Sequence, residues 1–287
     1  MISTTWYAAC GMVILLGCRK TDEVPAYVVI PAVSVSATDA QGGSTSKITD
    51  VWVSLNDRSV GVWELPARVP VLGTGPNTIS VTPAVKRNGS FDDRLRYPYY
   101  STWSATLDLV PEQAVGAAPM VGYVEAVDFW LERFNEAGNL FNVSDDSDTT
   151  LLLYTATENP EVVLDGTSCG GFVLETGRDR INLYTNENFD PANGPAYIEL
   201  DYSTDINLTI GLSYTESGSS QAEPWILLVP TTQEGGLKWN KVYIDVSSFF
   251  NVAGLSQRNI YIAAALPPGQ ATAHVYLDNF KLIRAAS

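Results

Sequence analysis

Glu199 and Asp201 are the acidic pair in this chain whose type and spacing could do chemistry. Residues two apart on a β-strand point to the same face, and both acids lie in the strand we expect over 196–201. Hydrolysis of a glycosidic bond needs two carboxyl groups that face each other across the bond, about 5 to 9.5 Å apart. We interpret this pair as surface acids on a solvated strand face.

The sequence around this pair matches the first part of a catalytic motif but not its last residue. Glu199-Leu200-Asp201 resembles the start of the Glu-x-Asp-x-x-Glu motif of laminarinase-type jelly-roll hydrolases, whose third acid would fall at Thr204. A threonine cannot transfer a proton as a carboxyl group does. The chain has one histidine, His274, and no Gly-rich phosphate loop. We therefore expect no enzymatic activity, and a jelly-roll glycoside hydrolase is the least favoured function.

Four aromatic residues could bind a sugar. Tyr97, Tyr99, Tyr100 and Trp103 cluster between two expected strands, next to two arginines. Sugars stack their apolar ring faces on aromatic side chains, and a few polar groups fix their orientation. We take these four residues as candidate ligand-binding residues. The alternative is that they pack at a sandwich edge against the neighbouring unit, because aromatic side chains dominate cores and interfaces.

The beginning of the chain resembles a bacterial lipoprotein signal. Residues 6–16 form an apolar run that is shorter than the roughly 20 residues needed to span a bilayer. The run ends in Leu15-Leu16-Gly17-Cys18, which resembles a lipobox. The resemblance implies cleavage before Cys18 and a lipid anchor on that cysteine. No Lys or Arg precedes the run, although export signals normally carry positive charge there.

The residues after Cys18 indicate an address. Arg19-Lys20-Thr21-Asp22-Glu23 resembles the Bacteroidota signal that sends a lipoprotein to the outer face of the outer membrane. The resemblance implies a lipid-anchored, cell-surface protein. An ordinary charged linker is the alternative.

Composition restricts the partners. The 287 residues carry a net charge of −15, and phosphate binding by nucleic-acid proteins needs basic patches. We therefore expect no nucleic-acid partner. Once Cys10 is removed and Cys18 acylated, Cys169 is the remaining thiol, and no intramolecular disulfide is expected. We interpret Cys169 as a small buried or semi-buried thiol.

Hydrophobic alternation predicts an all-β fold. Residues 50–55 place Val51 and Val53 on one face, and Asn56-Asp57 then turns the chain into a second strand. Short strands at such spacing predict an N-terminal Ig-like antiparallel sandwich. This part, from Ile48 to Val53 and on to the tyrosines at 97–100, resembles a segment common in uncharacterised Bacteroidota surface lipoproteins.

Nine further strands predict a jelly-roll β-sandwich for the second half. Its last strand, 275–282, and the strand 239–245 resemble those of galactose-binding-like and carbohydrate-binding jelly rolls. Residues 125–136 fit either a short helix or a strand. The predicted organisation is a signal peptide (1–17), a tether (18–25), the Ig-like unit (26–118) and the jelly roll (119–287), with a hinge at Ala117-Ala118-Pro119.

The resemblance to carbohydrate-binding jelly rolls also implies a structural calcium. In those folds the ion ties the first strand to the last, and calcium takes six to eight oxygen ligands. Asp278 would be the late ligand, and Glu132 or Glu136 the early one. The alternative is that Asp278 faces a turn or a backbone amide.

The function we favour from the sequence is a non-catalytic surface lipoprotein that binds a glycan or a partner outer-membrane protein. The alternative is a structural accessory subunit of an outer-membrane complex.

Overall fold

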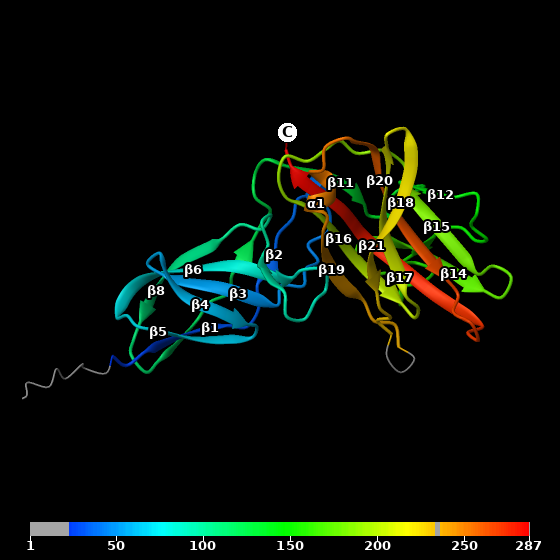
Figure 1. Cartoon of the computed structure of the whole chain (residues 1–287). Helices are drawn as coiled ribbons and strands as arrows, with labels where there is room; N and C mark the ends of the chain where they lie inside the picture. Colours follow the sequence, from blue (N-terminus) through cyan, green and yellow to red (C-terminus); the bar gives the residue numbers. More distant parts are fainter. Residues whose placement is uncertain (1–22, 233–235, 287) are drawn as a thin grey trace, which may run out of the picture.

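The computed structural model describes residues 23–232 and 236–286, so Cys10 and Cys18 lie outside the described residues. The described chain is all-β, as predicted, and forms two lobes (Figure 1). Helical structure in these two ranges is confined to the 3-10 turn η1 (Asp39–Gln41) and the one-turn α1 (Ser247–Phe250). Neither is long enough to cross a membrane, and the described ranges hold no other helix.

The first unit packs a three-stranded sheet against a five-stranded one. The smaller sheet has the order β5-β1-β9, with β1 (Ala26–Ile30), β5 (Ala67–Val71) and β9 (Ala114–Gly116). The larger sheet contains β3 (Asp50–Leu55), β4 (Arg58–Glu64), β6 (Gly75–Lys86), β7 (Arg94–Arg96) and β8 (Trp103–Leu109). Buried valines of both sheets, such as Val28 and Val51, share one core.

Two pairings in this unit depart from the antiparallel sandwich that we expected. β1 runs parallel to β9, and β2 (Ser34–Val35) runs parallel to β10 (Met120–Val121). The two-layer architecture is therefore as predicted, while the Ig-like assignment stays a prediction.

The β3–β4 hairpin follows directly from local sequence. Val51 and Val53 are buried, as their alternation predicts. Asn56 and Asp57 have φ of 48° and 63°, the left-handed region in which Asn and Asp are tolerated better than most residues. Two such residues in succession make the tight turn that joins twisted antiparallel strands. The predicted hairpin is confirmed.

The predicted hinge at Ala117–Pro119 is wrong. The N–H of Ala117 donates to the carbonyl of Val29, and the carbonyl of Pro119 accepts from the N–H of Ser34. The segment is thus held between β9 and β10, and Tyr123 still belongs to the core of the first unit. The chain passes to the second unit only between Tyr123 and the start of β11, because backbone pairing fixes everything before it.

The second unit is a sandwich of two antiparallel sheets. One sheet has the order β13-β14-β21-β16-β19, and β11 also pairs with β21; its strands are β11 (Val127–Glu132), β13 (Leu152–Thr155), β14 (Ser168–Glu175), β16 (Ala196–Thr204), β19 (Asn240–Asp245) and β21 (Thr272–Ala285). The other has the order β12-β15-β20-β17-β18, with β12 (Phe141–Val143), β15 (Arg180–Thr185), β17 (Leu208–Glu216), β18 (Ser219–Leu228) and β20 (Leu255–Ala265). The segment 125–136 therefore supplies a strand rather than a helix.

Alternation along β16 separates the two faces of the first of these sheets. Ile198 and Leu200 point into the sandwich core. Tyr197, Glu199 and Asp201 are on the other face, and Tyr197 packs with the core of the first unit. The first unit therefore covers the part of the outer face around Tyr197 and Tyr243, whereas the β15 sheet lies on the side away from it (Figure 1).

Candidate functional site

The predicted tyrosines lie between the two units. Tyr97, Tyr99 and Tyr100 are only 1 to 3% exposed. The Tyr97 ring centre is 5.3 Å from that of Tyr197 on β16 and 4.9 Å from that of Tyr243 on β19. Rings packed on one another in this way cannot present a face to a sugar, so their assignment as a ligand platform is corrected. The alternative, packing against the neighbouring unit, is what the structure has.

Trp103 does not belong to this cluster. It pairs with Val81 across β6 and β8, and both side chains lie on the inner face of that sheet. Trp103 is half-buried there, packed on the core of the first unit. It therefore presents no exposed ring to a ligand next to the tyrosines, and its assignment is corrected with theirs.

Glu199 and Asp201 share one face of β16, as predicted, but the face is not solvated. The Lys241 Nζ lies 3.3 Å from Glu199 Oε2 and 3.4 Å from Asp201 Oδ2. The side chains of Glu199 and Asp201 are 0% and 3% exposed. Because solvent does not reach the two acids, neither can touch a polysaccharide in this structure, and their interpretation as surface acids is corrected.

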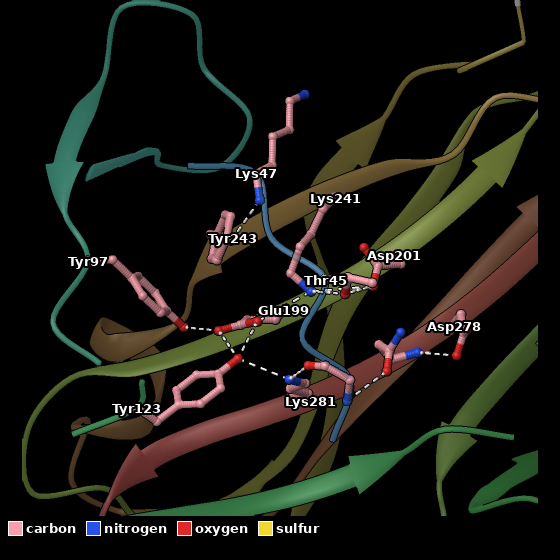
Figure 2. A network of polar contacts seen from close by, with 12 residues as sticks. Thr45, Lys47, Tyr97, Tyr123, Glu199, Asp201, Lys241, Tyr243, Asp278 and Lys281 are labelled. Atoms are coloured by element: carbon pink, nitrogen blue, oxygen red, sulfur yellow. Dashed lines mark hydrogen bonds and ion pairs between the residues drawn. The ribbon is translucent and has the colours of Figure 1, made fainter. Parts of the chain in front are cut away.

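Residues of the first unit complete this network (Figure 2). The Tyr97 hydroxyl donates to Glu199 Oε1 at 2.8 Å, and the Tyr123 hydroxyl donates to Glu199 Oε2 at 2.9 Å. The Lys281 Nζ donates to the Tyr123 hydroxyl at 3.0 Å and to the carbonyl of Gly43 at 2.8 Å. Two buried carboxylates and two lysines thus join β16, β19 and β21 to loops of the other unit.

Burial and charge pull the pKa of Lys241 in opposite directions. Burial lowers the pKa of Lys241, but the carboxylates of Asp201 and Glu199 raise it by more than burial lowers it. The pKa of Lys241 therefore lies above the ordinary value of 10.5. Burial and the Glu199 carboxylate also raise the pKa of the Tyr97 hydroxyl well above 10.0. Lys241 therefore stays charged and Tyr97 stays protonated near neutral pH. The network is thus a set of buried ion pairs and hydrogen bonds that joins the two units.

The three predicted calcium ligands do not come together. Glu132 accepts hydrogen bonds from the backbone N–H groups of Phe134 and Leu140, and Glu136 is exposed. No group of three or more His, Cys, Asp or Glu side chains that could hold a metal ion exists in the described ranges. Glu132 and Glu136 are therefore corrected as partners of Asp278.

Asp278 itself keeps a feature that suits a cation. Burial raises the pKa of its carboxyl group to about 8. Its Oδ1 accepts from the backbone N–H of Asn279, while its buried Oδ2 has no hydrogen-bond partner among the described residues. Calcium at Asp278 stays a prediction with this single carboxylate in its support.

Cys169 is the buried thiol that the sequence predicts. It is 0% exposed, and its Sγ donates to the carbonyl of Val162 at 3.4 Å. Burial raises the pKa of the thiol to about 12. A protonated thiol is a poor nucleophile.

A second aromatic group, missed by the sequence analysis, lies on the outer face of the β15 sheet. Tyr184 on β15 and Tyr261 on β20 are paired across the sheet, with ring centres 5.6 Å apart and planes at 37°. Tyr261 also lies over Gly211 on β17, where an added Cβ would come within 1.9 Å of its ring. The glycine therefore lets the tyrosine ring lie flat along the sheet.

Polar side chains surround Tyr184. It lines a hollow of about 230 Å³ together with Asn188, Ser213, Gln221, Gln257 and Asn259, among others. The sequence signal was available in the alternation of Asn182 and Tyr184 with buried Ile181 and Leu183. That pattern marks one polar face with an aromatic residue, but it does not say whether another element covers the face.

Comparisons with known proteins give structural similarities only. No family model and no curated protein matches the sequence. Among solved structures, the C-terminal family 22 carbohydrate-binding module of Clostridium thermocellum Xyn10B is 12% identical, with a TM-score of 0.39, and the match covers 54% of this chain and 93% of that one. TmCBM61, solved with β-1,4-galactotriose, is 18% identical with a TM-score of 0.33, covering 50% and 88%. A family 29 module, solved with mannohexaose, is 13% identical with a TM-score of 0.34, covering 55% and 91%.

Proposed function

We propose that this protein is a non-catalytic glycan-binding module and that the outer face of the β15 sheet holds the sugar. The observation that carries the proposal is the half-buried Tyr184 ring in a hollow lined by amide and hydroxyl side chains, next to Tyr261, which is 8% exposed and packs over Gly211. Aromatic rings supply the stacking surface for a sugar, and the polar side chains around them would fix its orientation. The first unit does not cover this face.

The test is affinity electrophoresis of the full chain in gels that contain xylan, galactan or glucomannan. We expect retardation in at least one gel and a roughly tenfold loss of affinity in Tyr184→Ala, because truncating an aromatic anchor typically costs more than about 1 kcal/mol. A matched control is Tyr276→Ala, since Tyr276 and Tyr154 form a similar pair on the other sheet, with ring centres 5.3 Å apart. Migration unchanged in every gel would favour the accessory-subunit alternative.

We further propose that Cys18 carries a lipid and that the protein is displayed on the outer membrane. The support is the lipobox-like sequence before Cys18 and the charged residues after it. Cys18→Ser should abolish palmitate incorporation and release the protein from the membrane fraction, because stable anchoring depends on the acyl chains attached to this cysteine. Cys10→Ser is the matched control and should remain acylated. Palmitate on the Cys18→Ser protein would overturn the anchor.

A further inference from the structure

A cleft of about 430 Å³ lies where the two units meet, beside the buried network. Lys47, Lys86 and Phe91 line it from the first unit, and Leu227, Val229 and Asn240 from the second. The two sides come from segments far apart in the sequence, so the cleft exists only when the units are docked.

The rim of the cleft is apolar and exposed. Phe91 is 81% exposed, Leu227 55% and Val229 63%. Single exposed apolar side chains are ordinary, but three around one cleft form a surface that a ligand can cover. Lys86 Nζ lies 5.3 Å from the centre of the Phe91 ring, so a positive charge adjoins the aromatic face.

Four charged side chains line the cleft: Lys47, Lys86, Lys241 and Glu64. Lys86 pairs with the buried Asp50 at 3.2 Å, and Arg94 pairs with both Asp50 at 3.0 Å and Glu64 at 3.6 Å. Lys47 Nζ donates to Asn240 Oδ1 at 2.6 Å, and within the described ranges no carboxylate lies in ion-pair distance of Lys47. The whole chain has a net charge of −15, so an ammonium group without an ion pair, as at Lys47, is unusual on its surface.

The surroundings of Lys47 disfavour its charge. Burial and the positive charge of Lys238 together lower the pKa of Lys47 below its ordinary value of 10.5. A carboxylate bound beside Lys47 would offset this positive charge.

The neighbouring sheet edge argues against a peptide strand as the ligand. The N–H of Asn88 donates to the carbonyl of Tyr243 at 2.8 Å, and Asn88 Oδ1 accepts from the N–H of Asp245 at 2.8 Å. These bonds use the free edge of β19 at the point where an added strand would pair. Sugar hydroxyls need only side-chain partners, and the cleft contains the Asn240 amide, which accepts from Lys47 and donates to the Tyr202 hydroxyl.

We propose that this cleft binds a carboxylate-bearing glycan, with Phe91 against a sugar ring and Lys47 beside the carboxylate of a uronic acid unit. The site is separate from the Tyr184 face, so either one can hold without the other. The chemistry that selects the ligand is a stacking ring combined with the unneutralised ammonium group of Lys47.

The experiment is calorimetric titration of the full chain with tetragalacturonate and with neutral galactotetraose. We expect binding of the acidic oligosaccharide that weakens as salt is added, because exposed charges are screened within about 10 Å at 0.1 M salt. Phe91→Ala and Lys47→Gln should each weaken it about tenfold. Met120→Ala and Arg178→Gln, at exposed residues that do not line the cleft, are the matched controls, and melting curves verify that each variant folds.

The outcomes separate this site from the other one. Tyr184→Ala should leave tetragalacturonate binding unchanged, so loss of neutral-glycan binding alone does not affect this proposal. Absence of tetragalacturonate binding, equal binding of the neutral sugar, or binding that survives both Phe91→Ala and Lys47→Gln would each overturn it. Binding of an alternating Leu-Glu peptide in place of the acidic sugar would also overturn it and assign the cleft to an acidic peptide.

Discussion

Lys241 Nζ lies 3.3 Å from Glu199 Oε2, and the two side chains are 4% and 0% exposed. Both residues belong to the second unit, yet Tyr97 and Thr45 of the first unit complete their hydrogen bonding. Separating the two units would expose part of this network to solvent. It would also leave the remaining polar groups without their hydrogen-bond partners. The orientation of the two units is therefore tied to the pairing of these charges.

Lys241→Met should destabilise the protein by about 3 to 5 kcal/mol, because it leaves two buried carboxylates without their cation. Urea unfolding at pH 7 measures the loss. Lys238→Met, at an exposed lysine, is the matched control and should change the free energy of unfolding by less than about 0.5 kcal/mol. Equal effects in the two variants would contradict the assignment of Lys241 as the central cation.

Tyr97→Ala should cost about 3 to 5 kcal/mol, because it leaves a cavity among packed rings. Tyr97→Phe keeps the ring and removes only the hydrogen bond to Glu199, so about 1 to 3 kcal/mol is expected. Denaturant unfolding gives both values. Affinity for neutral glycans should be unchanged in Tyr97→Phe, and a selective loss of affinity with unchanged stability would restore Tyr97 as a ligand-binding residue.

Stability should rise with pH above about 8 through Lys281. Burial lowers the pKa of this lysine from 10.5 to about 8, despite the Glu199 carboxylate, which raises it. Between these two values the unfolded chain holds a proton that the folded chain has released, so the folded state gains about 1.4 kcal/mol per pH unit. Below about pH 8 the lysine is protonated in both states and contributes no slope.

The check on Lys281 is urea unfolding of the wild type and Lys281→Met at pH 7, 8, 9 and 10. The difference in free energy, wild type minus variant, should be flat up to pH 8 and then increase. A difference that stays constant to pH 10 would show that Lys281 keeps its ordinary pKa.

Calcium should raise the melting temperature if Asp278 is a ligand. Burial holds the Asp278 carboxyl group protonated at pH 7, since its pKa is about 8, so calcium binding should also release a proton. Calorimetry in two buffers of different ionisation enthalpy detects that proton. Asp278→Asn should lose both effects. An unchanged melting temperature of the wild type in calcium would contradict the prediction of a calcium site.

Local patterns in the sequence predicted the elements well. The alternation of Val51 and Val53 and the Asn56-Asp57 turn predicted a hairpin that the structure contains. The spacing of Glu199 and Asp201 correctly predicted that they share a face. Each of these features depends on residues that are neighbours along one strand or turn, so a short stretch of sequence is enough.

What covers a face depends on segments that are distant in the sequence. Tyr97 and Glu199 are 102 positions apart and meet only because the first unit docks on the β16 sheet. Inward and outward side chains alternate around Tyr184 as they do around Glu199, but Tyr184 lies on a sheet that the first unit leaves uncovered. The two patterns alone do not show which face is covered. The amino-acid sequence by itself determined the strands, the turns and which side chains share a face, because the two-residue period of a strand is local. Tertiary structure alone decided which face was buried between the two units and which stayed open to a ligand, because burial is set by long-range packing.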